Sequence, residues 1–408
     1  MKIILVSSLL IPRSIGGIEI LTVLTAKALT KRGHQVTIYT GGPEKRRKED
    51  GVMIREIKEL VLPLHLKSFL MPFYSWRLRK RLEKEKDFLM ADIINAVDLD
   101  SIVALAGWEK IKEKLVVTIQ DYGLVCANGL LLYGQEICPN YCHQGKGFLC
   151  LNKRKISWLK KFYLQLAYSF RKQQRDKKIK RLNWGICVSH FVADKIKKYN
   201  SDLSIQVIGN CLPEEWWKIK SQREKEIDIL YVGRLESFKG TGVALQALKE
   251  VLVKKQLKVI FVGTGRVEEY RQMAQKMGLT EKITFTGGVD FQKMRDFYQK
   301  AKVVLVPSVW PEPCGRVIIE GMFFGGVVIS TNQGGTPELI IHGKNGLLVP
   351  PGNSGKLAQT ILWLFNRPER IEKIVRYASS YAHQSFKQGS LALKYERFYR
   401  LVLNQKID

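Results

Sequence analysis

The chain has 408 residues, of which 45% are hydrophobic and 26% are charged. This length allows two domains with complete cores, and the composition excludes a chain that is disordered by default. The formal net charge of +29 comes from 67 Lys and Arg residues against 38 Asp and Glu residues, and it favours phosphate-rich partners such as nucleotide diphosphates, anionic membranes or nucleic acid.

The hydropathy pattern does not predict a membrane-spanning segment. No apolar run approaches the roughly 18 residues of a spanning helix. The run at 1–7 is too short for a signal peptide and is soon followed by Pro12 and Arg13. We therefore expect a cytoplasmic protein whose seven cysteines are reduced.

The first half alternates strand-like apolar runs with stretches of helical periodicity. A strand at 2–8 precedes a glycine loop and a helix at 18–29, and further strands are expected at 35–40, 52–56, 92–97, 115–119 and 184–188. This order predicts a doubly wound α/β domain. Gly16 and Gly17 would let a ligand approach the helix N-terminus closely, with a bare turn as the alternative.

Polar side chains follow two of these expected strands. Gln120 and Asp121 come at the carboxyl edge of the strand at 115–119. Asp98 and Asp100 have the Asp-x-Asp spacing of some metal sites. A strand-end turn or a helix N-cap is the interpretation that we favour for both aspartates.

A group of cysteines follows, at Cys126, Cys138, Cys142 and Cys150, with His143 among them. Thiolate-rich sites suit a structural zinc ion, which is one interpretation of this group. The spacings lack paired Cys-x2-Cys knuckles, so a compact loop with ordinary buried thiols is the alternative.

Two aromatic and aliphatic segments each run into a basic tail. Residues 62–76 precede the tail at 77–81, and residues 156–170 precede the tail at 171–181. Core helices with solvated basic ends would explain both segments. The alternative is a surface that dips into a bilayer while its basic residues meet anionic headgroups.

The second half begins after a polar linker at 218–226. A strand starting at Asp228 delivers Arg234 and Lys239 to its carboxyl edge, where a guanidinium fork and a compact ammonium suit a pyrophosphate. An apolar run at 301–307 predicts a buried parallel strand.

Two glutamates flank the turn and helix that follow this last strand. Glu312 lies just past the strand, and Glu320 lies on the helix that begins near Gly315. Their helical rise would be roughly 12 Å, beyond the roughly 5 to 10 Å of a glycosidase acid and base pair. We expect them to contact two parts of one extended ligand.

Three motifs together resemble the retaining glycosyltransferases of the GT-B fold, family 4 class. These motifs are Glu-x7-Glu from Glu312 to Glu320, Val-Gly-Arg-x4-Lys-Gly ending at Gly240, and Gly-Gly-x-Glu from Gly16 to Glu19. The resemblance implies two Rossmann-like, doubly wound parallel-sheet domains that face each other across a cleft. Residues 1–210 would form the acceptor-side domain and 211–377 the donor-binding domain, with a C-terminal helix at 378–408 packing back on the first.

The resemblance also implies roles for particular residues. Glu312 would contact the donor sugar and Glu320 the ribose, with Gln120 and Asp121 completing the catalytic set. Family members carry histidine where this chain has Gln120, so we expect positioning but no proton uptake there. The other donor-binding positions would be Gly16, Gly17, Arg234, Lys239, Val289, Cys314, Gly315, Arg316 and Val317.

The predicted activity is transfer of a hexose or N-acetylhexosamine unit from a UDP- or GDP-linked sugar to a hydroxyl, with retained configuration. No metal is needed for this chemistry. We expect a glycan or lipid-linked acceptor, peripheral association with the inner membrane face, a role in polysaccharide biosynthesis, and no specific nucleic acid. The alternative is a non-catalytic membrane- or nucleic-acid-binding protein on the same fold.

Overall fold

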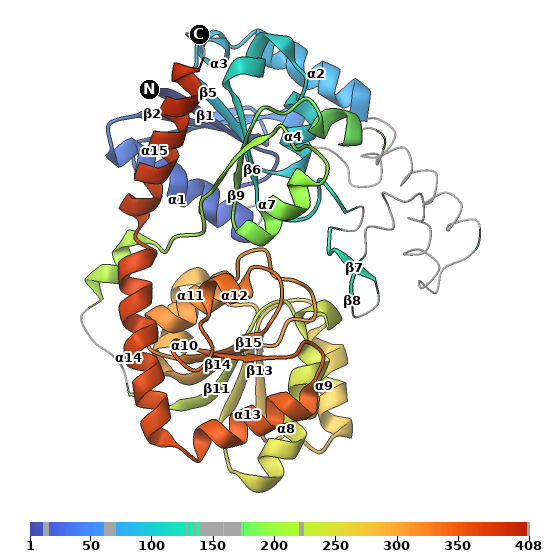
Figure 1. Cartoon of the computed structure of the whole chain (residues 1–408), viewed down its shortest axis with the longest axis vertical. Coiled ribbons are helices and arrows are strands. Elements are labelled where there is room, and N and C mark those ends of the chain that lie inside the picture. The colour runs from blue at the N-terminus through green and yellow to red at the C-terminus, as the bar shows by residue number, and fades with distance from the viewer. Residues whose placement is uncertain are drawn as a thin grey trace. The chain divides into compact units, whose positions relative to one another are not determined.

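The computed structural model describes residues 1–10, 16–60, 71–126, 129–133, 136–138, 158, 173, 175–219 and 224–405. The chain divides into two compact units (Figure 1), each described here by itself. Unit 1 comprises Met1–Tyr133, Cys138–Pro213 and Gln388–Asp408, and unit 2 comprises Glu214–Lys387 with residues 134–137. Cys142, Cys150 and most of both aromatic segments lie outside the described residues.

Unit 1 is built on an eight-stranded sheet of order β10-β9-β6-β5-β1-β2-β4-β3. All neighbours are parallel except β3 and β4, which are antiparallel. The strands are β1 (Lys2–Ser7), β2 (Gln35–Gly41), β3 (Lys45–Glu49), β4 (Val52–Ile57), β5 (Ile93–Ala96), β6 (Leu115–Ile119), β9 (Trp184–Cys187) and β10 (Ser204–Val207). The short strands β7 (Leu132–Tyr133) and β8 (Glu136–Ile137) lie outside this sheet.

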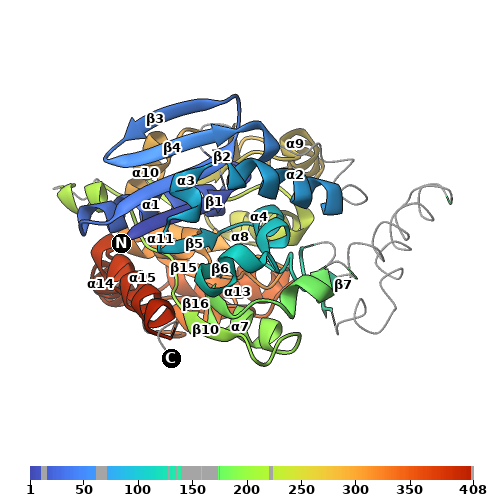
Figure 2. The ribbon, with the colours of Figure 1, turned by 90° about the horizontal axis from the view of Figure 1, so that it is seen from above.

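The helices of unit 1 lie in the connections between its strands, except the last one, which follows every strand of the chain. They are α1 (Gly17–Lys31), η1 (Lys58–Leu60), α2 (Met71–Glu83), α3 (Lys86–Leu89), α4 (Leu99–Leu105), η2 (Glu109–Lys114), α7 (His190–Lys197) and α15 (Gln388–Asn404). Apolar strands such as β1 are almost wholly buried, as expected for a parallel sheet covered on both faces. Strand β3 lies at the edge of the sheet (Figure 2) and instead has the largely exposed sequence KRRKE, which protects that edge from pairing with other chains.

Helix α15 comes from the far end of the chain and packs against α1 (Figures 1 and 2). The Gln388 side chain donates to the Leu24 carbonyl at 2.6 Å, and the buried Asn95 amide donates to the Tyr399 hydroxyl at 2.8 Å. Arg32 pairs with Glu396 at 2.6 Å. Residues before Gln388 belong to unit 2, so this packing starts ten residues later than the expected start at 378.

Unit 2 has a six-stranded parallel sheet of order β13-β12-β11-β14-β15-β16. Numbered within the unit, this is the order 3-2-1-4-5-6 of a dinucleotide-binding fold. The strands are β11 (Ile227–Val232), β12 (Val259–Val262), β13 (Ile283–Gly287), β14 (Ala301–Val306), β15 (Val327–Thr331) and β16 (Leu347–Val349). The strand order reverses between β11 and β14, where such sheets bind ligands beyond their carboxyl ends.

The helices of unit 2 are η3 (Glu214–Lys218), η4 (Ser237–Lys239), α8 (Thr241–Lys254), α9 (Val267–Lys276), α10 (Phe291–Lys300), α11 (Arg316–Phe323), α12 (Thr336–Leu339), α13 (Ser354–Phe365) and α14 (Pro368–Ser385). Helices α8 and α13 bury their apolar faces in one core cluster with the sheet. No helix in the described part of the chain combines the length and apolarity needed to cross a bilayer.

Candidate active site

Lys239 and Glu312 meet at the point in unit 2 where the strand order reverses. Lys239 ends the short helix η4 after β11, and Glu312 follows β14. The Lys239 Nζ atom lies 2.7 Å from the Glu312 Oε1 atom. The close approach depends on Gly240, whose φ is 72° and where a Cβ would lie 1.8 Å from the Pro307 carbonyl oxygen. Two loops that are distant in sequence are therefore packed backbone against backbone.

Glu312 is held by several groups and is 7% exposed. The Ser308 hydroxyl donates to its Oε1 atom at 2.5 Å, and the Gly335 N–H donates to its backbone carbonyl at 2.7 Å. Burial alone raises the pKa of this carboxyl, but the Lys239 ammonium and hydrogen bonds from Lys239 and Ser308 outweigh burial and lower the pKa below its usual value. Glu312 is therefore a fixed carboxylate at neutral pH.

Aromatic rings line the two cations. The Lys239 ammonium lies 4.6 Å from the centroid of the Trp310 ring, and the Arg234 guanidinium lies 5.4 Å from that of Phe238. The two rings contact each other edge to face at 5.8 Å. Arg234 is exposed and has no carboxylate partner among the described residues. Its donors are thus available to an anion, whereas Lys239 is shared with Glu312.

Glu320 is anchored at both of its oxygens. On α11, Arg316 donates to Oε1 at 2.6 Å across one helical turn, and Tyr298 of α10 donates to Oε2 at 2.7 Å. Burial and then the neighbouring Glu320 charge raise the pKa of Tyr298 well above its usual value, so its hydroxyl stays a donor. The position of the Glu320 carboxylate is thereby fixed from two helices.

The helix α11 begins where the sequence predicted. Gly315 is its N-cap, and a Cβ there would lie 2.7 Å from the Ile318 Cδ1 atom. The first helical residues, Arg316 and Val317, have no intrahelical acceptor for their N–H groups, and the half-buried Cys314 precedes them. Val289 lies two residues after the end of β13 and one residue before the N-cap of α10.

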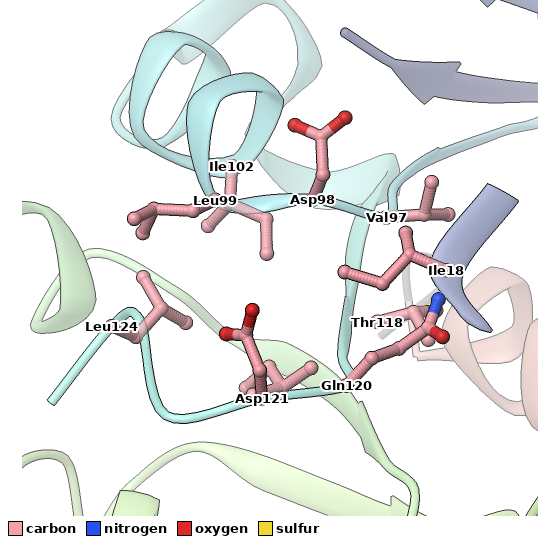
Figure 3. Close-up of a pocket in the computed structure, with 10 residues that line it drawn as sticks. Ile18, Val97, Asp98, Leu99, Ile102, Thr118, Gln120, Asp121 and Leu124 are labelled. Carbon is pink, nitrogen blue, oxygen red and sulfur yellow. The ribbon is translucent and has the colours of Figure 1, made fainter. Parts of the chain in front are cut away.

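At the corresponding edge of unit 1, Gln120 and Asp121 follow β6 and line a small pocket with Ile18 and Leu124 (Figure 3). The two side chains diverge, with the Gln120 amide directed toward Ile18 and the Asp121 carboxylate toward Leu99 (Figure 3). Asp121 accepts from the Gly123 N–H at 2.7 Å. Burial raises the pKa of Asp121, and this hydrogen bond partly offsets the rise.

The remaining expected residues of unit 1 have structural partners. Asp98 is the N-cap of α4 and accepts from Ser101 at 2.8 Å and from Ser7 at 3.0 Å, as the capping interpretation predicted. Gly16 is the N-cap of α1, where a Cβ would lie 2.5 Å from the Glu19 carboxylate. The glycine of the Gly-Gly-x-Glu motif therefore makes room for its own glutamate.

The described part of the cysteine group shows no metal site. Cys126 and Cys138 are buried, and the Cys126 sulfur accepts from the Leu131 N–H at 3.3 Å. No group of three or more His, Cys, Asp or Glu side chains among the described residues is arranged to hold a metal. Cys142 and Cys150 lie outside these residues, so the zinc interpretation stays a prediction.

Sequence reasoning did not find four residues that shape the site in unit 2: Ser308, Trp310, Phe238 and Tyr298. Ser308 precedes Glu312 by four residues, and Arg316 precedes Glu320 by four residues. This spacing is visible in the sequence and could have indicated both contacts. Nothing in the local sequence indicates that Tyr298 reaches Glu320, because that contact joins two separate helices.

Two family models match the chain. One, for the glycosyl transferases group 1, matches residues 214–381, and the other, for glycosyltransferase family 4, matches residues 15–216. The chain therefore belongs to the GT-B glycosyltransferases of the family 4 class, and the family and fold expected from its motifs are confirmed.

Individual relatives agree with this assignment. An uncharacterized glycosyltransferase of Methanocaldococcus jannaschii is 25% identical over 413 residues, which cover 99% of each protein. The structure of sucrose-phosphate synthase from Thermosynechococcus elongatus has a TM-score of 0.74 at 18% identity and covers 99% of each chain. That of Anabaena HepE in complex with UDP-glucose has a TM-score of 0.69 at 20% identity and covers 97% of this chain and 98% of the other.

Proposed function

We propose that the protein is a retaining glycosyltransferase that moves a hexose or N-acetylhexosamine unit from a nucleotide diphosphate sugar to a hydroxyl of a glycan or lipid-linked acceptor. The observation that carries this proposal is the partly buried Lys239–Glu312 pair, with the exposed Arg234 on the same loop as Lys239, where the strand order of unit 2 reverses. Binding of UDP-glucose by the similar Anabaena protein supports a nucleotide sugar as the donor.

In this proposal Arg234 and Lys239 bind the donor diphosphate. The bond between the anomeric carbon and the diphosphate oxygen breaks, and its electron pair leaves with the phosphate, whose charge the two cations stabilise. The acceptor oxygen forms the new bond on the same face of the sugar, and its proton passes to the departing phosphate oxygen. The N–H groups at the start of α11 add to the positive field.

The two glutamates bind opposite parts of the donor. Glu312, ionised and fixed by Ser308, accepts hydrogen bonds from sugar hydroxyls. Glu320, fixed by Tyr298 and Arg316, accepts from the ribose. Binding the diphosphate would compete with Glu312 for Lys239, which couples donor binding to the release of a Glu312 oxygen toward the sugar.

In unit 1, Gln120 and Asp121 position the acceptor side. The Gln120 amide offers both a donor and an acceptor but takes up no proton. Asp121, whose pKa burial raises, follows Gln120 directly in the sequence. The proposal therefore requires no general base at the position where family members have histidine.

The outer face of α2 supports association with the inner face of a membrane. Phe73, Trp76, Arg77 and Lys80 recur at helical spacing and are all exposed, with Phe73 and Trp76 at 55% and 56%. An aromatic pair beside two cations suits the boundary between acyl chains and anionic headgroups.

The test of catalysis is release of nucleoside diphosphate from a panel of UDP- and GDP-linked sugars. We expect slow hydrolysis of one donor by the wild type. The rate should fall by at least about a hundredfold in Glu312→Gln and in Lys239→Met, by analogy with removal of one transition-state contact. Glu338→Gln, on the short helix α12, is a control that should keep the activity. Nuclear magnetic resonance of the first-formed product should show retained anomeric configuration. Absence of turnover with every donor would favour a non-catalytic binding protein.

A further inference from the structure

Three cations from the two basic tails of the sequence converge at the carboxyl end of α4 in unit 1. Arg79 comes from the tail at 77–81, and Lys178 and Arg181 come from the tail at 171–181. Arg79 donates through Nε to the Ala104 carbonyl at 2.9 Å and through Nη2 to the Ala106 carbonyl at 3.0 Å. Lys178 donates to the same Ala106 oxygen at 2.8 Å.

The third cation, Arg181, has its side chain beside Gly107. A Cβ at Gly107 would lie 2.7 Å from the Arg181 Cδ atom and 3.0 Å from its Nη1 atom, and the φ of Gly107 is 74°. The Arg79 guanidinium also lies 5.9 Å from the centroid of the Trp108 ring. The cations thus surround one turn of backbone that is built to admit them.

The positive charge of this group exceeds what its surroundings neutralise. A helix C-terminus presents about half an elementary negative charge, against three full positive charges. Arg79, Lys178 and Arg181 form no ion pair in the described residues. The sequence ranges outside these residues contain a single acidic residue, the C-terminal Asp408, so those ranges supply almost no carboxylate that could pair with them.

The mutual repulsion is visible in the ionisation of Lys178. Burial, followed by the charges of Arg79 and Arg181, lowers the pKa of Lys178 to about 8. Burial and Arg181 also lower the pKa of Arg79. Among the described residues, no carboxylate offsets these effects at either group. A bound anion would relieve both the repulsion and the desolvation.

Hydrogen-bond donors remain available for such an anion. Within the described residues, Arg79 Nη1, two of the three Lys178 N–H groups and the whole Arg181 guanidinium have no protein acceptor. Arg181 is exposed, so the group is open to solvent. Guanidinium forks and an ammonium together match the oxygens of a phosphate.

We propose that Arg79, Lys178 and Arg181 form a binding site for a phosphate group, separate from the residues of unit 2 that the proposed catalysis uses. The phosphate is either free in solution or part of a lipid headgroup, since both present the same oxygens. The site lies at the end of α4. Helix α2, which carries the exposed pair Phe73 and Trp76, packs against α4.

The test compares Arg181→Glu with Lys177→Glu. Both variants change the net charge by two, and both residues are exposed and have side chains that make no hydrogen bond in the described residues, so neither change removes a side-chain hydrogen bond. A second variant, Lys178→Gln, removes the charge but keeps an N–H donor for the Ala106 carbonyl. None of the three lies in the proposed catalytic site.

Two probes distinguish the sources of the phosphate. In equilibrium dialysis with radiolabelled inorganic phosphate, the wild type and Lys177→Glu should bind one phosphate more than Arg181→Glu. In sedimentation with phosphatidylcholine vesicles that contain phosphatidic acid, the wild type and Lys177→Glu should bind about tenfold or more tightly than Arg181→Glu and Lys178→Gln, as expected for loss of one contact to a charged group.

Loss with inorganic phosphate identifies free phosphate as a ligand, and loss only with vesicles identifies a lipid headgroup. If Arg181→Glu matches Lys177→Glu with both probes, the site does not exist. Both measurements omit the nucleotide sugar. Their outcome is therefore independent of whether the proposed glycosyl transfer is correct.

Discussion

Replacing Lys239 by Met would leave the Glu312 carboxylate buried without its counter-charge. Breaking one partner of a buried pair typically costs about 3–5 kcal/mol. The Lys239 side chain is 21% exposed and that of Glu312 is 9% exposed, and the Ser308 hydrogen bond would remain. We therefore expect the lower end of this range, about 3 kcal/mol of the free energy of unfolding of unit 2 at pH 8.

The pH dependence of this loss follows from the direction of the pKa. In the wild type, the pKa of Glu312 is lower in the folded state than in the unfolded state, so the pair stabilises the fold at every pH above the usual carboxyl pKa. This contribution is lost as the pH falls through the lower pKa of the folded state. Without Lys239, burial becomes the dominant influence and raises the pKa of Glu312 above its unfolded value. The destabilisation is then complete above the raised pKa and disappears as the pH falls below the unfolded value.

Urea unfolding at pH 8 and pH 5, followed by tryptophan fluorescence, measures both effects. The double variant Lys239→Met with Glu312→Gln should recover most of the lost stability at pH 8, because it removes the unpaired charge. As a matched control, Lys302→Met breaks an ion pair with Asp228 in which Lys302 is 41% exposed, and it should cost less than about 1 kcal/mol. A double variant no more stable than the single one at pH 8 would refute this reasoning.

Three further predictions concern other contacts. Tyr298→Phe removes the hydroxyl that donates to Glu320 and should lower the free energy of unfolding by about 1–3 kcal/mol. The KM for the donor should rise by a larger factor than kcat falls. Unchanged kinetics would show that Glu320 does not depend on Tyr298. Gly240→Ala places a Cβ 1.8 Å from a carbonyl oxygen, and urea unfolding should show a loss greater than the roughly 1–2 kcal/mol of left-handed strain alone. The control Gly343→Ala has a φ of 76° but nothing within 4 Å, so equal losses in both variants would contradict the packing argument. Hydrogen bonds from Arg32 and Arg400 lower the pKa of Glu396 to about 2, so Glu396→Gln should speed amide exchange in α15 at pH 7. The difference in exchange rate between variant and wild type should fade as the pH falls below the usual pKa of 4.5 toward about 2. An effect independent of pH would exclude this linkage.

Several strands of both sheets could be predicted because parallel strands buried on both faces have continuous apolar sequences. The run at 301–307, for example, corresponds to β14 (Ala301–Val306). Strand β3 has only charged residues and is specified by its antiparallel pairing with β4, so no local pattern reveals it. The aromatic-rich C-terminal tail was expected to be helical, but its division at Phe386 and Lys387 was not visible in the sequence.

The positions of the candidate site residues at strand ends could also be predicted, but their pairings could not. Arg234, Lys239 and Glu312 were placed at carboxyl edges by counting from apolar runs. That Lys239 pairs with Glu312 depends on β11 and β14 being neighbours, which is a non-local property of the fold. The same holds for Arg79 with Lys178, whose common acceptor, Ala106, belongs to neither basic tail.

Helix α15 has a consequence for the order in which the protein can fold as it is synthesised. Every strand of the large sheet of unit 2 has left the ribosome before Gln388 appears, and domains generally fold as units from their available segments. The earlier part of unit 1, although made first, still lacks α15. Until that helix arrives, the amide of Asn95, fully buried in the finished fold, has no Tyr399 hydroxyl to bind. A chain that stops prematurely near residue 387 would therefore be damaged in the unit at its opposite end.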